Sequence, residues 1–391
     1  MTLQESWDAT TAAQLRERGG LKWTTGGPGS IGAFVAEMDF GTAPEIGAAL
    51  AAAVGRGELG YLTPGRSRGL REAASAFYRT ELGAEIPPQH VHEVADVLTA
   101  LAFTITHLTS PGSPVIVPTP AYMPFLDLPP TLGREVIRVP LIPGPHGPTP
   151  DPAGIARAFA AGAELLILCN PSNPVGRVFT RGELEGVAAV VTAAGGRVFA
   201  DEIWAPLIYP GHTHVPYAGL NEHTAAHTTT GYSASKAWNL PGLKTAQLIT
   251  HNEADLAVWE KFGTFTALGA STLGVIAGIT AYREGGPWLR EALEYLDGNR
   301  AELGSLLAEL LPEVGYSPPE GTYVAWLDLR GLDLPDPVAA WAADGVLLTD
   351  GAACGAPGFA RLILALPRPL LREAVTRMAA TVRRARAART A

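Results

Sequence analysis

The sequence predicts an α/β protein with a large domain, in which helices sandwich a mostly parallel sheet, and a smaller α+β domain. The chain has 391 residues, 47% of them hydrophobic and 17% charged, which is typical of a soluble globular protein with a large core. Short apolar segments alternate with helical patterns through the middle of the chain, and this pattern changes after residue 312. A chain of this length usually divides between two cores, so we expect two domains.

The strand-like segments of the middle region are apolar and bounded by turn residues. They lie at 114–118, 164–171, 197–203, 227–233 and 245–251, and helical patterns lie at 67–82, 97–109, 152–161, 180–194, 253–265, 270–284 and 287–311. Apolar strands that alternate with helices are typical of buried parallel strands. The helix at 180 also has a start signal, because Thr180 can cap it while Glu183 reaches back.

The two ends of the chain have a different pattern of strands, helices and loops from the middle region. Segments 322–329, 345–351 and 359–366 predict strands of a second sheet, closed by a helix from about residue 369. The first 40 residues are expected to be irregular, and "TTGGPGSIG" (24–32) lacks the Gly-Lys-Ser/Thr ending of a phosphate loop, so we expect a flexible lead-in. We therefore place the large domain at 45–285 and the small domain at 1–44 and 286–391.

Charge and cysteine content exclude several classes of protein. The net charge of −9 argues against nucleic acid as a partner, and the basic run at 383–389 is expected to end a C-terminal helix. Two cysteines, Cys169 and Cys354, exclude a disulfide framework and a cysteine-based zinc site. No apolar signal region opens the chain and no membrane-spanning run occurs, so we expect a cytoplasmic protein without a membrane partner.

Two features at predicted strand ends suggest a site for an anion and a ring oxygen. In "ADVLTAL" (95–101) a strand leads into a helix, so the amides of Val97 and Leu98 would point at an anion, favoured by the helix dipole. In "NPSNPVGR" (170–177) two Asn-Pro pairs constrain the backbone, and Asn173 could donate its amide to a phenolate-like oxygen. Taken alone, the first feature is equally consistent with an ordinary strand-to-helix junction and the second with an ordinary Pro-rich turn.

Two further features supply an acid and an amine. In "ADEIWAP" (200–206) we expect Asp201 to be buried, while Glu202 points to the opposite face of the strand. The stretch "YSASKAWNLPGLK" (232–244) offers the hydroxyls of Ser233 and Ser235 and the amines of Lys236 and Lys244. Taken alone, "ADEIWAP" is equally consistent with a solvated strand end, and "YSASKAWNLPGLK" with a surface loop.

Together the four features match the functional groups of pyridoxal 5'-phosphate. An anion cradle, an amide donor, a buried acid and an amine would meet the phosphate, the ring hydroxyl, the pyridine nitrogen and the aldehyde of this cofactor. Lys236 would hold the aldehyde covalently, and Asp201 would keep the ring nitrogen protonated. The positive ring would then act as an electron sink for breaking a Cα–H bond.

The order of these motifs resembles the class I/II aminotransferase family of fold-type I pyridoxal-phosphate enzymes. Within this family the chain is similar to the cystathionine β-lyase (MalY/PatB) branch, through "VAEMDF" (35–40), "GYLTPG" (60–65), "PTPAYMPF" (118–125), "NPSNPVGRVFT" (170–180), "ADEIWAPL" (200–207), "SKAWNLPGLK" (235–244) and "EGTYVAWLDL" (320–329). The match runs from about 34 to 380, nearly the whole chain.

The resemblance implies a role for each site residue. Lys236 is the Schiff-base lysine that moves the Cα proton, Asp201 pairs with the pyridinium, and Asn173 bonds the ring hydroxyl and borders the substrate. The other implied residues are Tyr122 stacked on the ring, Trp204 and Ser235 beside the cofactor, Ser233, Lys244 and the amides of Val97 and Leu98 at the phosphate, Tyr61 from a partner subunit, and Arg361 on the substrate carboxylate. A shared site of this kind implies an obligate homodimer. Without the resemblance, Arg361 would be interpreted as a surface charge at a strand end.

Three positions depart from the family pattern. Lys244 stands in place of an arginine at the phosphate, which keeps the charge and loses the forked geometry. Asp96 stands in place of a glycine beside the phosphate, so this acid must turn away or find a partner. Trp204 stands in place of Tyr or His near the ring hydroxyl, and an indole N–H can donate a hydrogen bond without exchanging a proton. We expect an active enzyme with specialised substrates.

"GHTHVPY" (211–217) contains a His-x-His pair without an evident third metal ligand. We therefore predict no metal site and interpret this segment as a loop at the site entrance.

The favoured function is α,β-elimination on cystathionine-like or S-substituted cysteine substrates, which yields a thiol, pyruvate and ammonia. The alternative is an aminotransferase that returns the amino group to a 2-oxoacid with the same residues. A third hypothesis, a transcriptional regulator with this fold, needs an additional N-terminal helix-turn-helix module. Only about 40 residues precede the matching region and the chain is acidic, which argues against this hypothesis.

Overall fold

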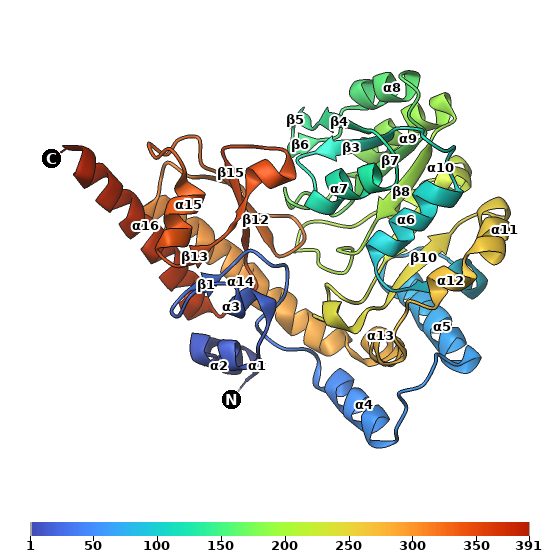
Figure 1. Ribbon diagram of the computed structural model, residues 1–391, viewed down its shortest axis with the longest axis horizontal. Coiled ribbons are helices and arrows are strands. Elements are labelled where there is room, and N and C mark those ends of the chain that lie inside the picture. Colours follow the sequence, from blue (N-terminus) through green and yellow to red (C-terminus); the bar gives the residue numbers. More distant parts are fainter. Residues whose placement is uncertain (1, 391) are drawn as a thin grey trace. The chain divides into compact units, whose positions relative to one another are not determined.

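The computed structural model describes residues 2–390 and divides into two compact units, most of whose elements are labelled in Figure 1. The larger unit comprises Thr42–Asn173 and Arg177–Leu289. The smaller unit comprises Met1–Gly41, Pro174–Gly176 and Arg290–Ala391. Each unit has a sheet of its own, as the change in the pattern of strand-like and helical segments after residue 312 predicts.

A seven-stranded, mostly parallel sheet forms the centre of the larger unit. Its strands, in spatial order, are β2 (Val91–Val94), β10 (Ala246–Thr250), β9 (Thr228–Tyr232), β8 (Arg197–Asp201), β7 (Leu165–Cys169), β3 (Val115–Thr119) and β4 (Val136–Pro140). Strands β9, β8, β7, β3 and β4 run parallel to one another. The apolar segments are thus buried parallel strands with one exception, and the predicted α/β fold class is confirmed.

The exception is β10, which the sequence pattern predicts as a parallel strand and which pairs antiparallel with both β9 and β2. A parallel neighbour would need a crossover connection over one face of the sheet, usually a helix. The connection from β9 to β10 contains only one short 3₁₀ turn, η3 (Pro241–Leu243). The apolar composition of β10 shows that it is buried, but it carries no information about direction.

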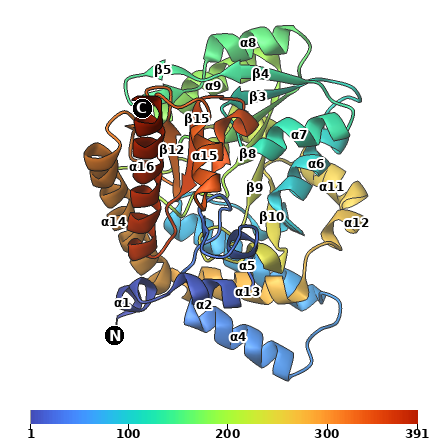
Figure 2. The same cartoon turned by 60° about the vertical axis from the view of Figure 1, so that its left-hand side comes forward.

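Helices cover both faces of the sheet of the larger unit, which is the sandwich that the sequence predicts. Helices α6 (Val97–His107), α7 (Met123–Thr131) and α11 (Glu253–Phe262) pack on one face, and α8 (Pro152–Ala160) and α9 (Arg181–Ala194) pack on the other. Figure 2 shows α6 and α7 on one side of the strands and α8 and α9 on the other. The predicted capping box of α9 is present, because Thr180 accepts from the Glu183 amide while the Glu183 side chain accepts from the Thr180 amide.

Further helices complete this unit. They are α4 (Pro44–Gly55), α5 (Pro64–Glu81), α10 (Glu222–His227), α12 (Thr264–Ala267) and α13 (Thr272–Glu284), with the 3₁₀ turns η1 (Pro88–His90) and η2 (Tyr217–Gly219). A hairpin of β5 (Ile142–Gly144) and β6 (Gly147–Thr149) follows β4.

The smaller unit contains a four-stranded antiparallel sheet in the order β11 (Gly315–Tyr316), β12 (Val324–Asp328), β15 (Phe359–Ile363) and β14 (Thr349–Asp350). A separate parallel pair joins β1 (Ile31–Gly32) to β13 (Val346–Leu347), so the predicted strand at 345–351 is divided between two sheets. Its helices include α14 (Gly286–Leu310), which begins in the larger unit, α15 (Pro337–Ala343) and α16 (Arg368–Thr390).

The first 40 residues are more ordered than the composition predicts. They form α1 (Leu3–Asp8), α2 (Ala12–Glu17) and α3 (Leu21–Thr24), and Lys22 makes a buried ion pair of 3.0 Å with Asp39. A Cβ atom on Gly32 would lie 1.9 Å from the carbonyl oxygen of Lys22, so this glycine permits close backbone packing. The expected flexible lead-in is therefore wrong, because its glycines serve tight packing as well as turns.

Membrane insertion through a helix has no support in the fold: none of the helices within residues 2–390 combines the length and apolar character needed to cross a bilayer.

Candidate active site

The carboxyl ends of β7 and β8 bring a thiol and a carboxylate together. Cys169 and Asp201 are the last residues of these neighbouring strands and stand opposite each other in the register. The Sγ atom of Cys169 lies 3.6 Å from Oδ2 of Asp201, and the Ile203 amide donates to Oδ1 at 3.1 Å. Asp201 is only 3% exposed. It is therefore the buried acid that the sequence predicts.

Burial raises the pKa of Asp201 from its ordinary 3.8 to about 6. The Ile203 amide, the Cys169 thiol and the charge of Lys236 all favour the carboxylate, and their combined effect is smaller than the desolvation. Burial likewise raises the pKa of the Cys169 thiol, so this group is a neutral donor. A cation placed beside Asp201 would lower its pKa again, and the protonated nitrogen of a pyridine ring is such a cation.

Lys236 follows β9 and lies near Trp204 and Asp201. Its Nζ atom is 5.5 Å from the centre of the Trp204 ring, and its charge acts on Asp201. Trp204 is buried at 2% exposure. A half-buried amine next to a buried acid and an aromatic face is the arrangement that the sequence predicts for a covalent aldehyde site.

The N-terminus of α6 forms the anion end of the site. Asp96 caps the helix by accepting from the Thr99 amide at 2.8 Å, while its other oxygen lies 3.1 Å from Nζ of Lys244. The first amides of a helix have no acceptor within the helix, so those of Val97 and Leu98 are available to an anion. Burial alone would raise the pKa of Asp96, but the bonds from Thr99 and Lys244 hold it below its ordinary value.

Asn173 and Tyr122 border the same strand ends. Asn173 is 4% exposed and lines a small cavity with Ala121, Cys169 and Ser172. Tyr122 is the cap residue of α7, and its ring meets Phe125 edge-on at 5.4 Å between centroids. The structure thus brings Tyr122 and Asn173 to neighbouring strands, together with Cys169, which the sequence analysis did not single out as functional. The sequence did offer a signal for Cys169, because this residue ends an apolar run directly before the Asn-Pro motif.

The hydroxyl of Ser233 is already engaged within the larger unit. It donates to the Thr245 carbonyl at 2.8 Å and accepts from the Ser235 amide at 3.0 Å, and Ser233 is 1% exposed. A phosphate oxygen is an acceptor, so Ser233 could bind it only by giving up the bond to Thr245. In this conformation Ser233 shapes the turn that leads to Lys236.

The structure also describes Arg361 and Tyr61, which belong to different units. Arg361, on β15 of the smaller unit, is 3% exposed and donates through Nη2 to the Phe34 carbonyl at 2.9 Å and to Thr349 at 3.3 Å. It is therefore a buried side chain and not a surface charge. Tyr61 lies in the larger unit and is 94% exposed.

The His-x-His segment does not border these strand ends. His214 is buried beside Glu202, with 3.5 Å between Nε2 and Oε2. Glu202 follows Asp201 along the strand and its side chain points to the opposite face, so the expected position at the site entrance is wrong for His214. Within residues 2–390 no group of three metal-binding side chains occurs.

The donor set at the strand ends fits pyridoxal 5'-phosphate. The raised pKa of the buried Asp201 calls for a cationic partner, the α6 N-terminus with Lys244 suits a phosphate, and Lys236 offers the amine for an aldehyde. These three groups belong to one unit.

Comparison with known proteins identifies the family. The model of the aminotransferase class I and II family matches residues 34–378. The chain is 39% identical to cystathionine β-lyase of Corynebacterium glutamicum, over 94% of this chain and 98% of the relative.

Solved structures agree with this assignment. A structure from Corynebacterium diphtheriae, for which a PLP-dependent β-cystathionase activity has been suggested, is 35% identical with a TM-score of 0.91, covering 96% of this chain and 98% of that one. Cystalysin from Treponema denticola, whose crystal structure contains pyridoxal 5'-phosphate, is 26% identical with a TM-score of 0.89, covering 96% and 99%. The chain belongs to the class I and II aminotransferase family and has the fold of its pyridoxal-phosphate-dependent members.

Proposed function

We propose that the protein is a pyridoxal-phosphate-dependent C–S β-lyase that cleaves cystathionine-like or S-substituted cysteine substrates by α,β-elimination. The observation that carries the proposal is the buried Asp201 at the end of β8, 3% exposed, with the amine of Lys236 close enough to act on it. The C. glutamicum relative, named cystathionine β-lyase, supports the choice of reaction. When bound, pyridoxal phosphate withdraws electrons from the substrate Cα and so acidifies its C–H bond.

The residues of this chain would then act as follows. Asp201 holds the ring nitrogen in its protonated state, and the α6 N-terminus with Lys244 fixes the phosphate. The amine of Lys236 takes the Cα proton, and the electron pair left at Cα expels the sulfur from Cβ as a thiolate. The thiolate takes up a proton to leave as a thiol, and hydrolysis of the three-carbon fragment gives pyruvate and ammonia.

The other site roles are part of the same proposal. Asn173 would donate to the ring hydroxyl, Tyr122 would stack on the ring, and Trp204 and Ser235 would border it. Arg361 would hold the substrate carboxylate in a forked pair, since a buried arginine is well suited to bidentate binding. We assign the cofactor to residues 45–285 as the large domain, and Arg361 to a small domain of residues 1–44 and 286–391.

Transamination is the second candidate, because the family description is that of an aminotransferase. It uses the same lysine and acid and returns the amino group to a 2-oxoacid. Purified protein incubated with cystathionine, without a 2-oxoacid, separates the two. Release of thiol and pyruvate supports the lyase, whereas turnover that requires an added 2-oxoacid and yields no thiol refutes it.

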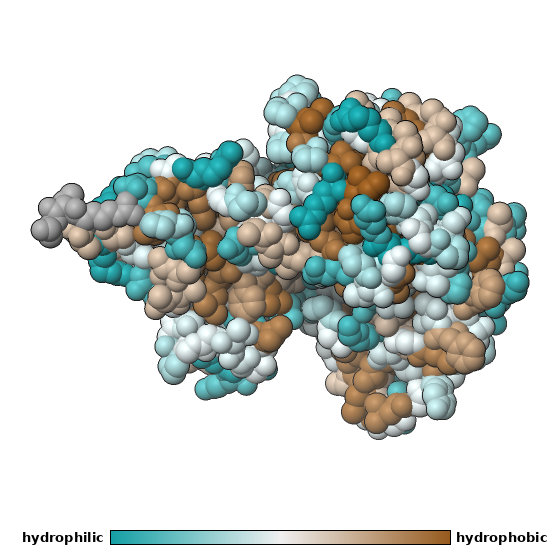
Figure 3. All heavy atoms as spheres, turned by 45° about the horizontal axis from the view of Figure 1, so that its top comes forward, coloured by the Kyte–Doolittle hydropathy of each residue, from teal (hydrophilic) through white to brown (hydrophobic). Residues whose placement is uncertain are grey.

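We also propose that the protein is a homodimer with shared sites. Tyr61 and its neighbour Leu59 are 94% and 65% exposed, and Leu268 and Phe265 add exposed apolar surface in the same unit. Leu59, Tyr61 and Leu268 line one pocket of about 650 Å³, and an apolar surface of this kind favours a second copy of the chain. Figure 3 shows apolar side chains, in brown, exposed at the lower right of the molecule.

Complementation between two inactive variants tests the shared site. A mixed dimer of Lys236→Ala and Tyr61→Ala chains contains one site in which both residues are intact. Partial recovery of activity on mixing and refolding supports Tyr61 as the partner's contribution, while no recovery, with light scattering confirming mixed dimers, contradicts it.

We further propose a cytoplasmic location, since both cysteines are free thiols.

A further inference from the structure

A triangle of hydrogen bonds within the smaller unit holds the guanidinium of Arg361. Its Nη2 atom donates to the Phe34 carbonyl oxygen at 2.9 Å and to Oγ1 of Thr349 at 3.3 Å. The Thr349 hydroxyl in turn donates to the same Phe34 oxygen at 3.1 Å. Because the threonine oxygen accepts from the arginine while its own proton goes to the carbonyl, the three groups fix one another's positions.

The strand register accounts for the contact between Arg361 and Thr349. Arg361 lies on β15, which pairs with β12 on one side and with β14 on the other. Figure 1 shows β15 beside β12. Thr349 is the residue directly opposite Arg361 on β14. Side chains that are directly opposite in an antiparallel pair share one face of the sheet, so the hydroxyl reaches the guanidinium from a neighbouring strand.

The Phe34 carbonyl is held in place by bonds at residues on both sides of it. The Ala33 carbonyl accepts from the Ile363 amide of β15 at 2.9 Å. The Ala36 carbonyl accepts from the Tyr323 hydroxyl at 3.0 Å. The Phe34 oxygen is therefore an acceptor with a fixed position relative to β15.

The two acceptors orient the positive charge of Arg361 without cancelling it. A carbonyl and a hydroxyl are neutral, whereas a carboxylate in their place would compete with an incoming anion. The Phe34 oxygen and the Thr349 hydroxyl are bonded to each other, so they lie close enough to share one N–H of Nη2. A guanidinium has five such donors, and a forked pair with a carboxylate uses two of them.

We propose that Thr349, together with the Phe34 carbonyl, is a positioning residue that orients Arg361 toward the carboxylate of the amino-acid substrate. The inference rests on the proposed function, in which Arg361 binds that carboxylate. A side chain that is already ordered loses less conformational freedom on binding, so its affinity for the ligand is higher. Since the carboxylate is held alike before and during the reaction, the effect falls on KM and leaves kcat nearly unchanged.

Spectral titration of the cofactor-loaded protein with L-alanine and with ethylamine tests the proposal. The two ligands differ only in the carboxylate, and L-alanine has no leaving group on Cβ, so it cannot be eliminated. Thr349→Val keeps the branched shape and removes the hydroxyl. We expect this variant to weaken L-alanine binding by about tenfold and to change ethylamine binding by less than about twofold. Thr349→Ser keeps the hydroxyl and should bind both ligands as the wild type does.

Two further variants serve as controls. Thr376→Val, on α16, removes an exposed hydroxyl that also donates to a backbone carbonyl, that of Arg372 at 2.8 Å, and should change neither affinity. Arg361→Lys loses the forked geometry and should abolish the preference for L-alanine over ethylamine. Circular dichroism and the thermal midpoint verify that each variant folds. With cystathionine as the substrate, Thr349→Val should raise KM by about tenfold and leave kcat within about twofold.

The outcomes separate this inference from the proposed function, because the titration needs no turnover. If Arg361→Lys abolishes the preference for L-alanine and a folded Thr349→Val leaves it intact, the positioning role is overturned and the role of Arg361 stands. Equal weakening of both ligands by Thr349→Val also overturns the positioning role. A wild type that binds both ligands equally, or an unchanged preference in Arg361→Lys, overturns the role of Arg361 as well.

Discussion

Lys244 Nζ lies 3.1 Å from Oδ2 of Asp96, so the two residues that depart from the family pattern at the phosphate end pair with each other. Both side chains are partly exposed, which limits the stability of the pair to at most about 1 kcal/mol. Its consequence is for cofactor binding, because a phosphate must compete with Asp96 for the ammonium group of Lys244.

Replacing Asp96 with Asn should strengthen cofactor binding several-fold. Asn keeps the cap on the Thr99 amide, since Asn and Asp are equally good at this position, while the negative charge beside the phosphate is removed. Fluorescence titration of the apoprotein with pyridoxal phosphate measures the effect. As a control, Lys244→Ala should weaken binding by about tenfold, the loss expected for one charge-assisted bond. Weaker binding by Asp96→Asn would show that Asp96 supports the site.

The stability of the apoprotein should fall with pH because of Asp201. Its pKa is about 6 in the folded chain and 3.8 ordinarily, so the folded state binds the proton more tightly. The resulting stability is fully present below about pH 4 and is lost as the pH rises through 6, by roughly 3 kcal/mol. Urea unfolding of wild type and Asp201→Asn at pH 4 and 7.5 measures this, because the variant lacks the effect. Parallel pH profiles would contradict the assigned burial.

Cys169 should tune Asp201 as a hydrogen-bond donor. Its thiol favours the carboxylate form, so Cys169→Ala should raise the pKa of Asp201 above about 6 in the apoprotein. Cys169→Ser retains a donor and should leave the value close to that of the wild type. The same urea series, extended between pH 5 and 8, gives the position of the transition for each variant. An unchanged transition in the alanine variant would show that packing is the only role of Cys169.

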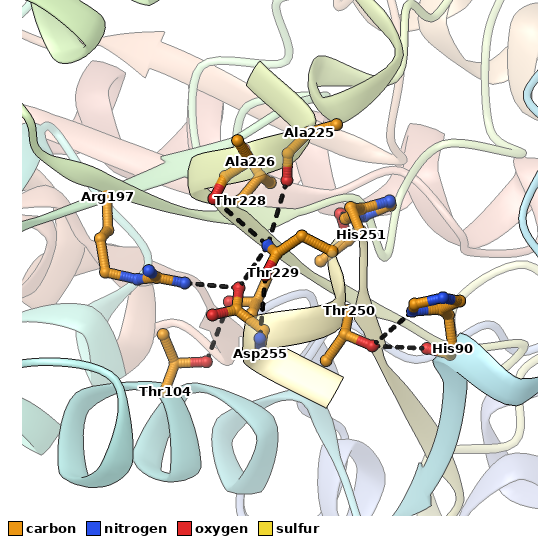
Figure 4. Close-up of polar contacts among 12 residues, drawn as sticks. His90, Thr104, Arg197, Ala225, Ala226, Thr228, Thr229, Thr250, His251 and Asp255 are labelled. Carbon is orange, nitrogen blue, oxygen red and sulfur yellow. Dashed lines mark hydrogen bonds and ion pairs between the residues drawn. The ribbon is translucent and has the colours of Figure 1, made fainter. Parts of the chain in front are cut away.

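The ion pair between Arg197 and Asp255 should contribute to the stability of the larger unit. Figure 4 shows Arg197 at the start of β8 reaching Asp255 of α11, whose side chain is 4% exposed and also accepts from Asn252 at 2.9 Å. Asp255→Ala leaves a half-buried guanidinium without its partner and should lower the free energy of unfolding by about 2 kcal/mol. Chemical denaturation of the holoenzyme checks this. As a matched control, the exposed Glu260→Ala on the same helix should change it by less than about 0.5 kcal/mol.

The parts of the site that depend on strand ends were predictable from sequence. Apolar runs locate buried strands; Asp201 ends such a run, and Lys236 and Asn173 come four residues after theirs. Since parallel strands end at one edge of a sheet, these residues had to gather there. The same rule places Cys169 opposite Asp201, and its position directly before the Asn-Pro motif was a signal for a functional role.

Features that depend on tertiary partners were not predictable. Asp96 and Lys244 are 148 positions apart, and nothing in either local pattern indicates their pairing. The antiparallel direction of β10 follows from its short connection, and the Ser233 bond to Thr245 follows from that direction. The burial of His214 beside Glu202 likewise arises only when a loop folds back on the sheet.

The central claim is that the amine of Lys236 carries the cofactor. Borohydride reduction of the purified yellow protein, followed by proteolysis and mass spectrometry, tests it most directly. We predict a phosphopyridoxyl group on Lys236 in the wild type and no labelled peptide in Lys236→Ala. A label on Lys244, or the absence of any label from the wild type, would contradict the account.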